Sequence, residues 1–163
     1  MSQPFPTSPQ LSSPLRDALF RDGGLPAPAT AADGKRVVGV VVEVGLEGGL
    51  DLLAAYDDHT ARYYNFSGAG VVWERADASL DESIDRLLAC GQTICSRIGP
   101  WKGARPAPPA EGQLRINLLT PLGLHFGQAP IAVFSRDPLA GPAIAAATAL
   151  MQQLIAKTRE RDT

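Results

Sequence analysis

The feature that most constrains the fold is a row of short apolar runs with no helical pattern between them. From residue 36 to residue 74 the apolar side chains recur with a period of two, and turn residues such as glycine and aspartate separate the runs. Consecutive parallel strands need a crossover of roughly a dozen residues, which these short connections cannot supply. The first half of the chain therefore predicts an antiparallel meander of three or four strands. The expected strands are residues 37–44, 50–56, 61–66 and 71–74.

Two later segments show the apolar period of an amphipathic helix. The first follows Ser79-Leu80-Asp81-Glu82, which we interpret as a capping box with Ser79 as the N-cap, and it ends before Gly99. The second opens at Asp137 and ends among basic residues, where positive charge complements the helix dipole. Each helix has a single apolar face, so we expect both to lie on a sheet rather than inside a helical bundle.

A β-hairpin is expected between the two long helices. Residues 114–118 alternate between apolar and polar side chains, and the turn Thr120-Pro121-Leu122-Gly123 follows soon after. We expect a three-residue loop that pairs Thr120 with Leu124, because this register places Phe126 on the apolar face of the hairpin. His125 then falls on the opposite face.

The N-terminal region is expected to be a flexible extension, residues 1–34, with one short helix over residues 14–22. Ser13 and Pro14 suit the N-cap and the first helical residue, and Gly23 suits the end. A helix of about two turns is too short to stand alone, so it either docks on the body of the protein or binds a partner. We favour docking, because short terminal helices often cover the edge or face of a sheet.

The order of these elements predicts an α+β fold in a single domain, residues 35–163. We expect a single antiparallel sheet of five to six strands, flanked by two long helices, with the short helix at the N-terminus. Residues 131–134 are a candidate for a further strand. The proline-rich stretch over residues 101–112 is expected to be an extended, exposed connector.

Composition and charge argue against several classes of function. The chain has 163 residues and a formal net charge of −2, without the broad basic surface of a nucleic-acid-binding protein. No run approaches the roughly 20 apolar residues of a membrane span, and residues 1–10 lack the layout of a secretion signal. We therefore expect a cytoplasmic protein that binds neither nucleic acid nor membrane.

No segment carries the spacing of a catalytic or metal-binding motif. Ser67 lacks the glycine two residues earlier that a nucleophile elbow requires. Two aspartates directly precede His59, so carboxylate and imidazole groups are adjacent in the sequence. The side chains of neighbouring residues in a tight turn point in different directions, which favours a solvated turn over a metal site. Cys90 and Cys95 lie about 8–9 Å apart on the predicted helix, beyond disulfide reach, and are expected to be buried thiols. We predict no catalytic residue, no metal and no cofactor, although an enzymatic role stays open.

The one segment that suggests a binding surface is aromatic. Residues 63–74 hold four of the ten aromatic residues of the chain, and aromatic strands with polar tips can line a pocket. If the sheet brings this segment beside the second hairpin, aromatic and polar side chains would share an open face. An ordinary strand with one face on the core is the favoured alternative. The candidate ligand-binding residues are Tyr63, Asn65, Trp73, Arg115, Asn117 and His125.

The order of elements over residues 13–161 resembles the profilin-like group, and roadblock/LC7 domains in particular. In those domains helices flank an antiparallel sheet, whereas this chain has three or four strands before the middle helix instead of two. The resemblance rests on topology and implies homodimerisation and a scaffolding or regulatory role, with no catalytic residue to carry over. Residues 61–74 also resemble stretches in bacterial proteins of unknown function.

Two functions follow as hypotheses. The first is a non-enzymatic module for protein interaction, scaffolding or regulation, homodimeric and with an unidentified partner. The alternative is a small-molecule-binding protein or enzyme that uses the polar and aromatic sheet face. An enclosed cavity among the candidate residues would favour the second hypothesis.

Overall fold

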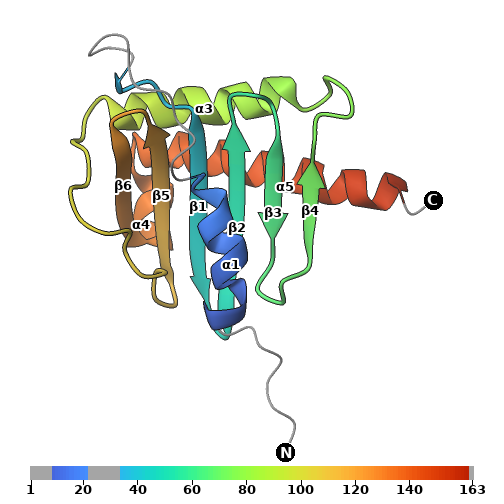
Figure 1. Cartoon of the computed structure of the whole chain (residues 1–163), viewed down its shortest axis with the longest axis horizontal. Helices are drawn as coiled ribbons and strands as arrows, with labels where there is room; N and C mark the ends of the chain where they lie inside the picture. The colour runs from blue at the N-terminus through green and yellow to red at the C-terminus, as the bar shows by residue number, and fades with distance from the viewer. Residues whose placement is uncertain (1–8, 22–33, 162–163) are drawn as a thin grey trace, which may run out of the picture.

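The computed structural model describes residues 9–21 and 34–161 of the chain. Its centre is a six-stranded antiparallel sheet with the strand order β4-β3-β2-β1-β5-β6 (Figure 1). This arrangement confirms the predicted α+β class. The strands are β1 (Gly39–Leu46), β2 (Gly49–Tyr56), β3 (Ala61–Tyr64), β4 (Gly70–Trp73), β5 (Gln113–Thr120) and β6 (Gly123–Pro130). The helices of the described part are α1 (Pro9–Leu19), α3 (Asp81–Cys95), α4 (Ile131–Arg136) and α5 (Ala140–Arg161).

Helices cover both faces of the sheet. The long helices α3 and α5 lie behind it in Figure 1, and the short α1 lies in front of β1 and β2. Side chains of β1 alternate between two cores, with Val40 and Val42 packed in the core under the long helices and Val41 in the core under α1. We call these the helix-layer face and the α1 face. Because β1 is covered on both sides, a mostly β-branched sequence suits it.

The meander of the first half forms as predicted. The pairs β1–β2, β2–β3 and β3–β4 are all antiparallel, and β1 also pairs antiparallel with β5. The β1–β2 turn contains Gly48 at φ 85°, a left-handed conformation that glycine adopts without steric cost. The described helices do not include one long and apolar enough to cross a membrane.

The long helices occur as expected, but their starts differ from the prediction. The residue before α3 is Leu80, no side chain caps this end, and Asp81 instead pairs with Arg75 at 2.6 Å. The predicted capping box at Ser79 is therefore wrong: Ser79 and Leu80 belong to a turn in which the Asp81 N–H donates to the Ala78 carbonyl at 3.2 Å, so Leu80 and not Ser79 directly precedes the helix. The carboxylate of Asp137 accepts the backbone N–H of Ala140 at 2.8 Å, which satisfies the start of α5. Residues 131–134 form the start of α4 instead of a strand.

The N-terminal helix begins earlier than predicted and docks on the sheet. It starts at Pro9, so Ser13 is not its N-cap and Pro14 lies inside it. The predicted end at Gly23 falls outside the described residues. Leu19 packs in the core of the α1 face, and its carbonyl accepts the Tyr56 hydroxyl at 2.6 Å. Docking was the favoured prediction for this helix.

The β5–β6 hairpin has a two-residue loop, and the predicted three-residue loop is wrong. Thr120 pairs with Gly123 instead of Leu124, which shifts the register by one residue. His125 therefore lies on the helix-layer face and Phe126 on the α1 face. This register is stable because the α1 face is covered here too: the Phe126 ring packs edge-on against Trp101, with centroids 5.1 Å apart.

The corrected register buries His125 completely. The side chain is 0% exposed, and neither ring nitrogen has a hydrogen-bond partner among the described residues. Burial lowers the pKa of His125, because the charged imidazolium loses its hydration. Protonation of this imidazole is therefore less favourable in the folded protein than in the unfolded chain, where a histidine titrates near pH 6.5.

This difference predicts a loss of stability in mild acid that depends on one residue. As the pH falls through about 6.5, the unfolded state takes up this proton before the folded state does, so the free energy of unfolding falls by up to about 1.4 kcal/mol per pH unit. The variant His125→Leu should lack this component in urea denaturation between pH 7 and pH 5. The variant His59→Gln, which retains His125, should keep it. Parallel pH profiles for wild type and His125→Leu would contradict the assignment.

Candidate functional site

The structure separates the six residues predicted to bind a ligand. Strands β3 and β5 are kept apart by β2 and β1, so the aromatic segment does not adjoin the second hairpin. The helix-layer face carries Tyr63, Trp73 and His125, whereas the α1 face carries Arg115 and Asn117. The open face that the six would have shared does not form, and ligand binding by any of them stays a prediction.

Several of these side chains have local partners. The Tyr63 hydroxyl donates to Asp51 at 3.3 Å. Asn65 lies after the end of β3, where its amide oxygen accepts the backbone N–H of Ser67 at 2.9 Å and its hydroxyl at 2.6 Å. Asn65 thus stabilises its own turn, as asparagine commonly does.

Arg115 and Asn117 belong to a buried ionic cluster around Glu43, which the sequence reading did not identify. The Glu43 carboxylate is 0% exposed on the central strand β1. It accepts the Arg16 Nε–H at 2.6 Å, the Asn117 side-chain amide at 2.9 Å and the Arg115 guanidinium at 3.4 Å. We call these four residues the Glu43 cluster.

The Glu43 cluster joins three separate segments of the chain. Arg16 belongs to α1 and also donates to the Pro106 carbonyl at 2.8 Å, while Arg115 donates to the Ala107 carbonyl at 2.8 Å. Two guanidinium groups face one carboxylate, so the carbonyls of the connector help to balance the second positive charge. Burial lowers the pKa of Arg115, and the charge of Glu43 opposes that shift. The cluster is a structural centre with every charged group paired.

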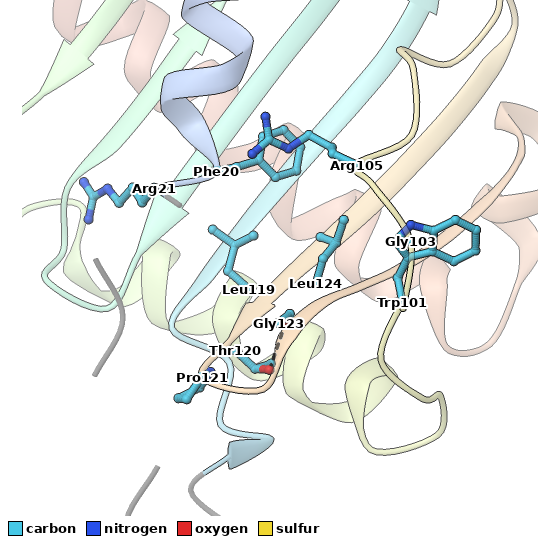
Figure 2. A pocket seen from close by; sticks show the side chains of 10 residues that line it. All are labelled: Phe20, Arg21, Trp101, Gly103, Arg105, Leu119, Thr120, Pro121, Gly123 and Leu124. Atoms are coloured by element: carbon cyan, nitrogen blue, oxygen red, sulfur yellow. Dashed lines mark hydrogen bonds between the residues drawn. The ribbon is translucent and has the colours of Figure 1, made fainter. Parts of the chain in front are cut away.

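A cavity of about 460 Å³ lies beside the end of α1, and we call it the α1-end cavity. Figure 2 shows Leu119 and Leu124 side by side beneath Phe20 and Arg105, with Arg21 and Trp101 on opposite sides. None of the six predicted binding residues lines it. Its described lining is Phe20, Arg21, Trp101, Gly103, Arg105, Leu119, Thr120, Pro121, Gly123 and Leu124.

Both arginines of the α1-end cavity are held in place by other side chains. The Arg105 guanidinium lies 4.0 Å from the centroid of the Phe20 ring and donates to Asp17 at 3.0 Å. The Arg21 guanidinium lies 3.3 Å from the centroid of the Tyr56 ring. Arg21 also pairs with Asp58 at 3.3 Å, so each of the two guanidinium groups has a carboxylate partner as well as an aromatic ring on which it stacks.

Little in the sequence predicted this cavity. Phe20 and Arg21 lie in the region interpreted as a flexible extension, and Trp101 and Arg105 lie in the proline-rich connector. Each pair combines an aromatic residue with an arginine, which was the available signal. No local spacing connects two segments that meet only in the folded chain.

The histidine and cysteine side chains of the described residues do not gather in one place. Residues 9–21 and 34–161 contain no group of three or more histidine, cysteine, aspartate or glutamate side chains that could hold a metal. His59 pairs with Asp85 at 2.9 Å. Cys90 and Cys95 are free, and burial raises the pKa of the Cys95 thiol, which makes it less reactive.

Comparison with known proteins assigns no family to this chain. No protein-family model matches it, and searches of curated proteins and of solved structures find no match either. The resemblance to roadblock/LC7 domains therefore stays a prediction from the order of elements.

The Glu43 cluster predicts that a single substitution in α1 weakens the whole fold. Arg16→Met should lower the free energy of unfolding by about 3–5 kcal/mol, because it removes one partner of a buried charge. Urea denaturation at neutral pH measures this loss. The control Arg86→Met removes an exposed pair with Glu82, 3.4 Å apart, and should cost less than about 1 kcal/mol. Equal small losses for both variants would show that the docking of α1 does not depend on Glu43.

Proposed function

We propose that this chain is a non-enzymatic protein-interaction module that works as a homodimer. The observation that carries the proposal is the outward face of α5. From residue 140 to residue 156 this helix has no charged residue, although it lies at the surface of the described structure. Surface helices of globular proteins normally direct charged residues toward water.

The two long helices differ in this respect. The outward residues of α3 include Glu82, Asp85 and Arg86, as expected of a helix that faces water. The inward side of α5 packs Leu150 and Leu154 in the core. Its outward side, which we call the α5 face, is exposed but uncharged. The α5 face consists of Pro142, Ala145, Thr148, Ala149, Gln152 and Ala156.

A second, independent observation lies beside the α5 face. An apolar recess of about 80 Å³ opens between α5 and the sheet, with Ile144, Thr148 and Met151 on the helix side and Val44 and Tyr63 on the sheet side. A recess of this size accommodates part of one apolar side chain, as interface cores do. The helix face and the recess share Thr148 and so adjoin, and Asp51, which accepts the Tyr63 hydroxyl at 3.3 Å, is the one ionisable carboxyl in the described lining of the recess.

A second copy of the chain is the partner that this surface fits best. In a two-fold dimer the same patch meets itself, so an uncharged patch meets no opposing charge of like sign. Small side chains allow two helices to approach closely. Dimerisation through α5 also agrees with what the roadblock/LC7 resemblance implies. A cytoplasmic location, a scaffolding or regulatory role, and the lack of nucleic-acid binding belong to the same proposal.

The oligomeric state tests the proposal directly. Size-exclusion chromatography with light scattering at micromolar concentration should give twice the chain mass of 17.2 kDa. The variant Ala149→Glu should be monomeric, because it places two carboxylates against each other across the two-fold axis.

The matched control is Ala89→Glu, which makes the same change at an exposed position of α3. This variant should remain dimeric and should unfold at a higher temperature than the monomeric Ala149→Glu, because association stabilises the folded state. A monomeric wild type would overturn the proposal. A dimeric Ala149→Glu would overturn the α5 face as the interface.

A further inference from the structure

Strand β4 leaves one edge of the sheet open. It ends the strand order, and no strand of residues 9–21 and 34–161 pairs with it on the side away from β3. The other edge strand, β6, is partly covered, because the Trp101 N–H of the connector donates to the Leu124 carbonyl at 2.7 Å. We propose that the open edge of β4 binds an extended, basic peptide segment of a partner protein, which adds a seventh strand to the sheet. The inference rests on the interaction role of the proposed function and names the kind of partner, but it does not depend on the dimer.

The hydrogen-bond pattern shows which backbone groups of β4 face outward. The Asn65 N–H donates to the Ala69 carbonyl at 2.9 Å, in register with the β3–β4 ladder. Residue pairs of an antiparallel ladder alternate between bonded and non-bonded, so Tyr63 and Val71 form the next bonded pair. The N–H and C=O of Val72 therefore point away from β3, and its side chain is 42% exposed. Unpaired groups of this kind are a template for the addition of another strand.

A groove of about 530 Å³ lies beside this edge, and we call it the β4 groove. Figure 1 shows that α5 continues past β4, so the helix layer extends beyond the edge of the sheet. Neighbouring strands lie about 4.8 Å apart, so a strand added to β4 would lie against the last turns of α5. Helix α5 would thus cover the inner side chains of the new strand. The lining of the β4 groove includes Val72 and Trp73 of β4, Glu74 and Asp77 of the following loop, and Lys157 and Glu160 of α5.

The charge of the β4 groove favours a basic segment. Its lining holds one ammonium group and three carboxylates, those of Lys157, Glu74, Asp77 and Glu160. The formal charge of this lining is −2, and it stays negative when Arg62, which pairs with Glu74 at 2.9 Å, is counted. The Glu74 and Glu160 side chains are 66% and 68% exposed, so their ion pairs are weak and can be replaced by the cations of a ligand. A lysine or arginine of the added strand would therefore meet a negative surface.

Trp73 provides a reporter inside the β4 groove. It lines the groove, and its indole N–H has no hydrogen-bond partner among the described residues. The Lys157 ammonium lies 5.6 Å from the centroid of its ring. The second tryptophan of the chain, Trp101, packs against Phe126 of the opposite edge strand and serves as an internal control.

The test compares three peptides of the same length. The ¹⁵N-labelled full chain is titrated with acetylated and amidated Lys-Val-Lys-Val-Lys-Val, and both indole N–H signals are followed by NMR, with Trp101→Phe for assignment. The Trp73 signal should shift saturably while the Trp101 signal stays still. The same peptide with every residue N-methylated has lost its backbone donors and should bind about tenfold more weakly. The peptide Glu-Val-Glu-Val-Glu-Val, which reverses the charge, should also bind about tenfold more weakly.

A pair of substitutions at one position then tests the edge itself. Val72→Pro removes the outward N–H, a change that an edge strand tolerates, and should weaken the lysine peptide about tenfold. The control Val72→Thr keeps the N–H and the β-branched shape and should bind as the wild type does.

The outcomes separate this inference from the dimer. Equal affinity of the wild type for the lysine peptide and its N-methylated form, or no shift of Trp73 at millimolar lysine peptide, would overturn strand addition. Equal affinity for the lysine and glutamate peptides would overturn the basic partner. If light scattering finds that Val72→Pro converts a dimeric wild type into a monomer, the edge pairs with a second copy, which overturns the partner peptide. A monomeric wild type that binds the lysine peptide would support this inference and remove only the dimer.

Discussion

The buried carboxylate of Glu43 is the interaction on which the arrangement of the α1 face depends. A charge on the central strand with no exposure costs several kcal/mol unless it is paired and hydrogen-bonded. The sheet alone supplies Arg115 and Asn117, and the shortest contact, to Arg16, comes from α1. The docking of α1 therefore supplies a positively charged partner that the buried Glu43 carboxylate requires. Satisfying the charges of this cluster also draws in the connector, whose carbonyls accept from both arginines.

The same contacts shape the α1-end cavity. Phe20 lies about one turn after Arg16, so pairing Arg16 with Glu43 also places the Phe20 ring on the cavity wall. Arg105 directly precedes Pro106, whose carbonyl is bound by Arg16, and it therefore stacks on that ring. A ligand that contacts these residues would bind only the docked form and would stabilise docking by mass action. The α5 face lies on the opposite side of the sheet and has no part in this coupling.

The apolar pattern and the turn residues predicted most of the helices and strands, but they gave the wrong register for the β5–β6 hairpin. The prediction of a three-residue β5–β6 loop assumed that Phe126 must lie on the same face of the hairpin as Leu114 and Ile116. The α1 face also has an apolar cover, in which Trp101 receives Phe126, so the alternative register was available. The consequence reached the candidate site, because His125 exchanged faces with Phe126 and became a buried, unpaired imidazole. Arg115 and Asn117 were correctly read as facing away from Leu114 and Ile116, but as an open surface instead of partners of a buried charge.

The pattern of apolar residues along the sequence was sufficient to predict the meander, the two long helices and their apolar faces. Apolar periods of 2 and 3.6 residues can be recognised within a single strand or helix. It could not show which face α1 covers, or that Glu43 would meet Arg16 and Arg115. Those partners lie 27 and 72 residues away in the chain, and no local period relates them. The cavity and the face assignments follow from contacts of this kind. Such contacts form only in the packed fold, where a charged group that has been removed from water must pair with residues that are distant in the chain.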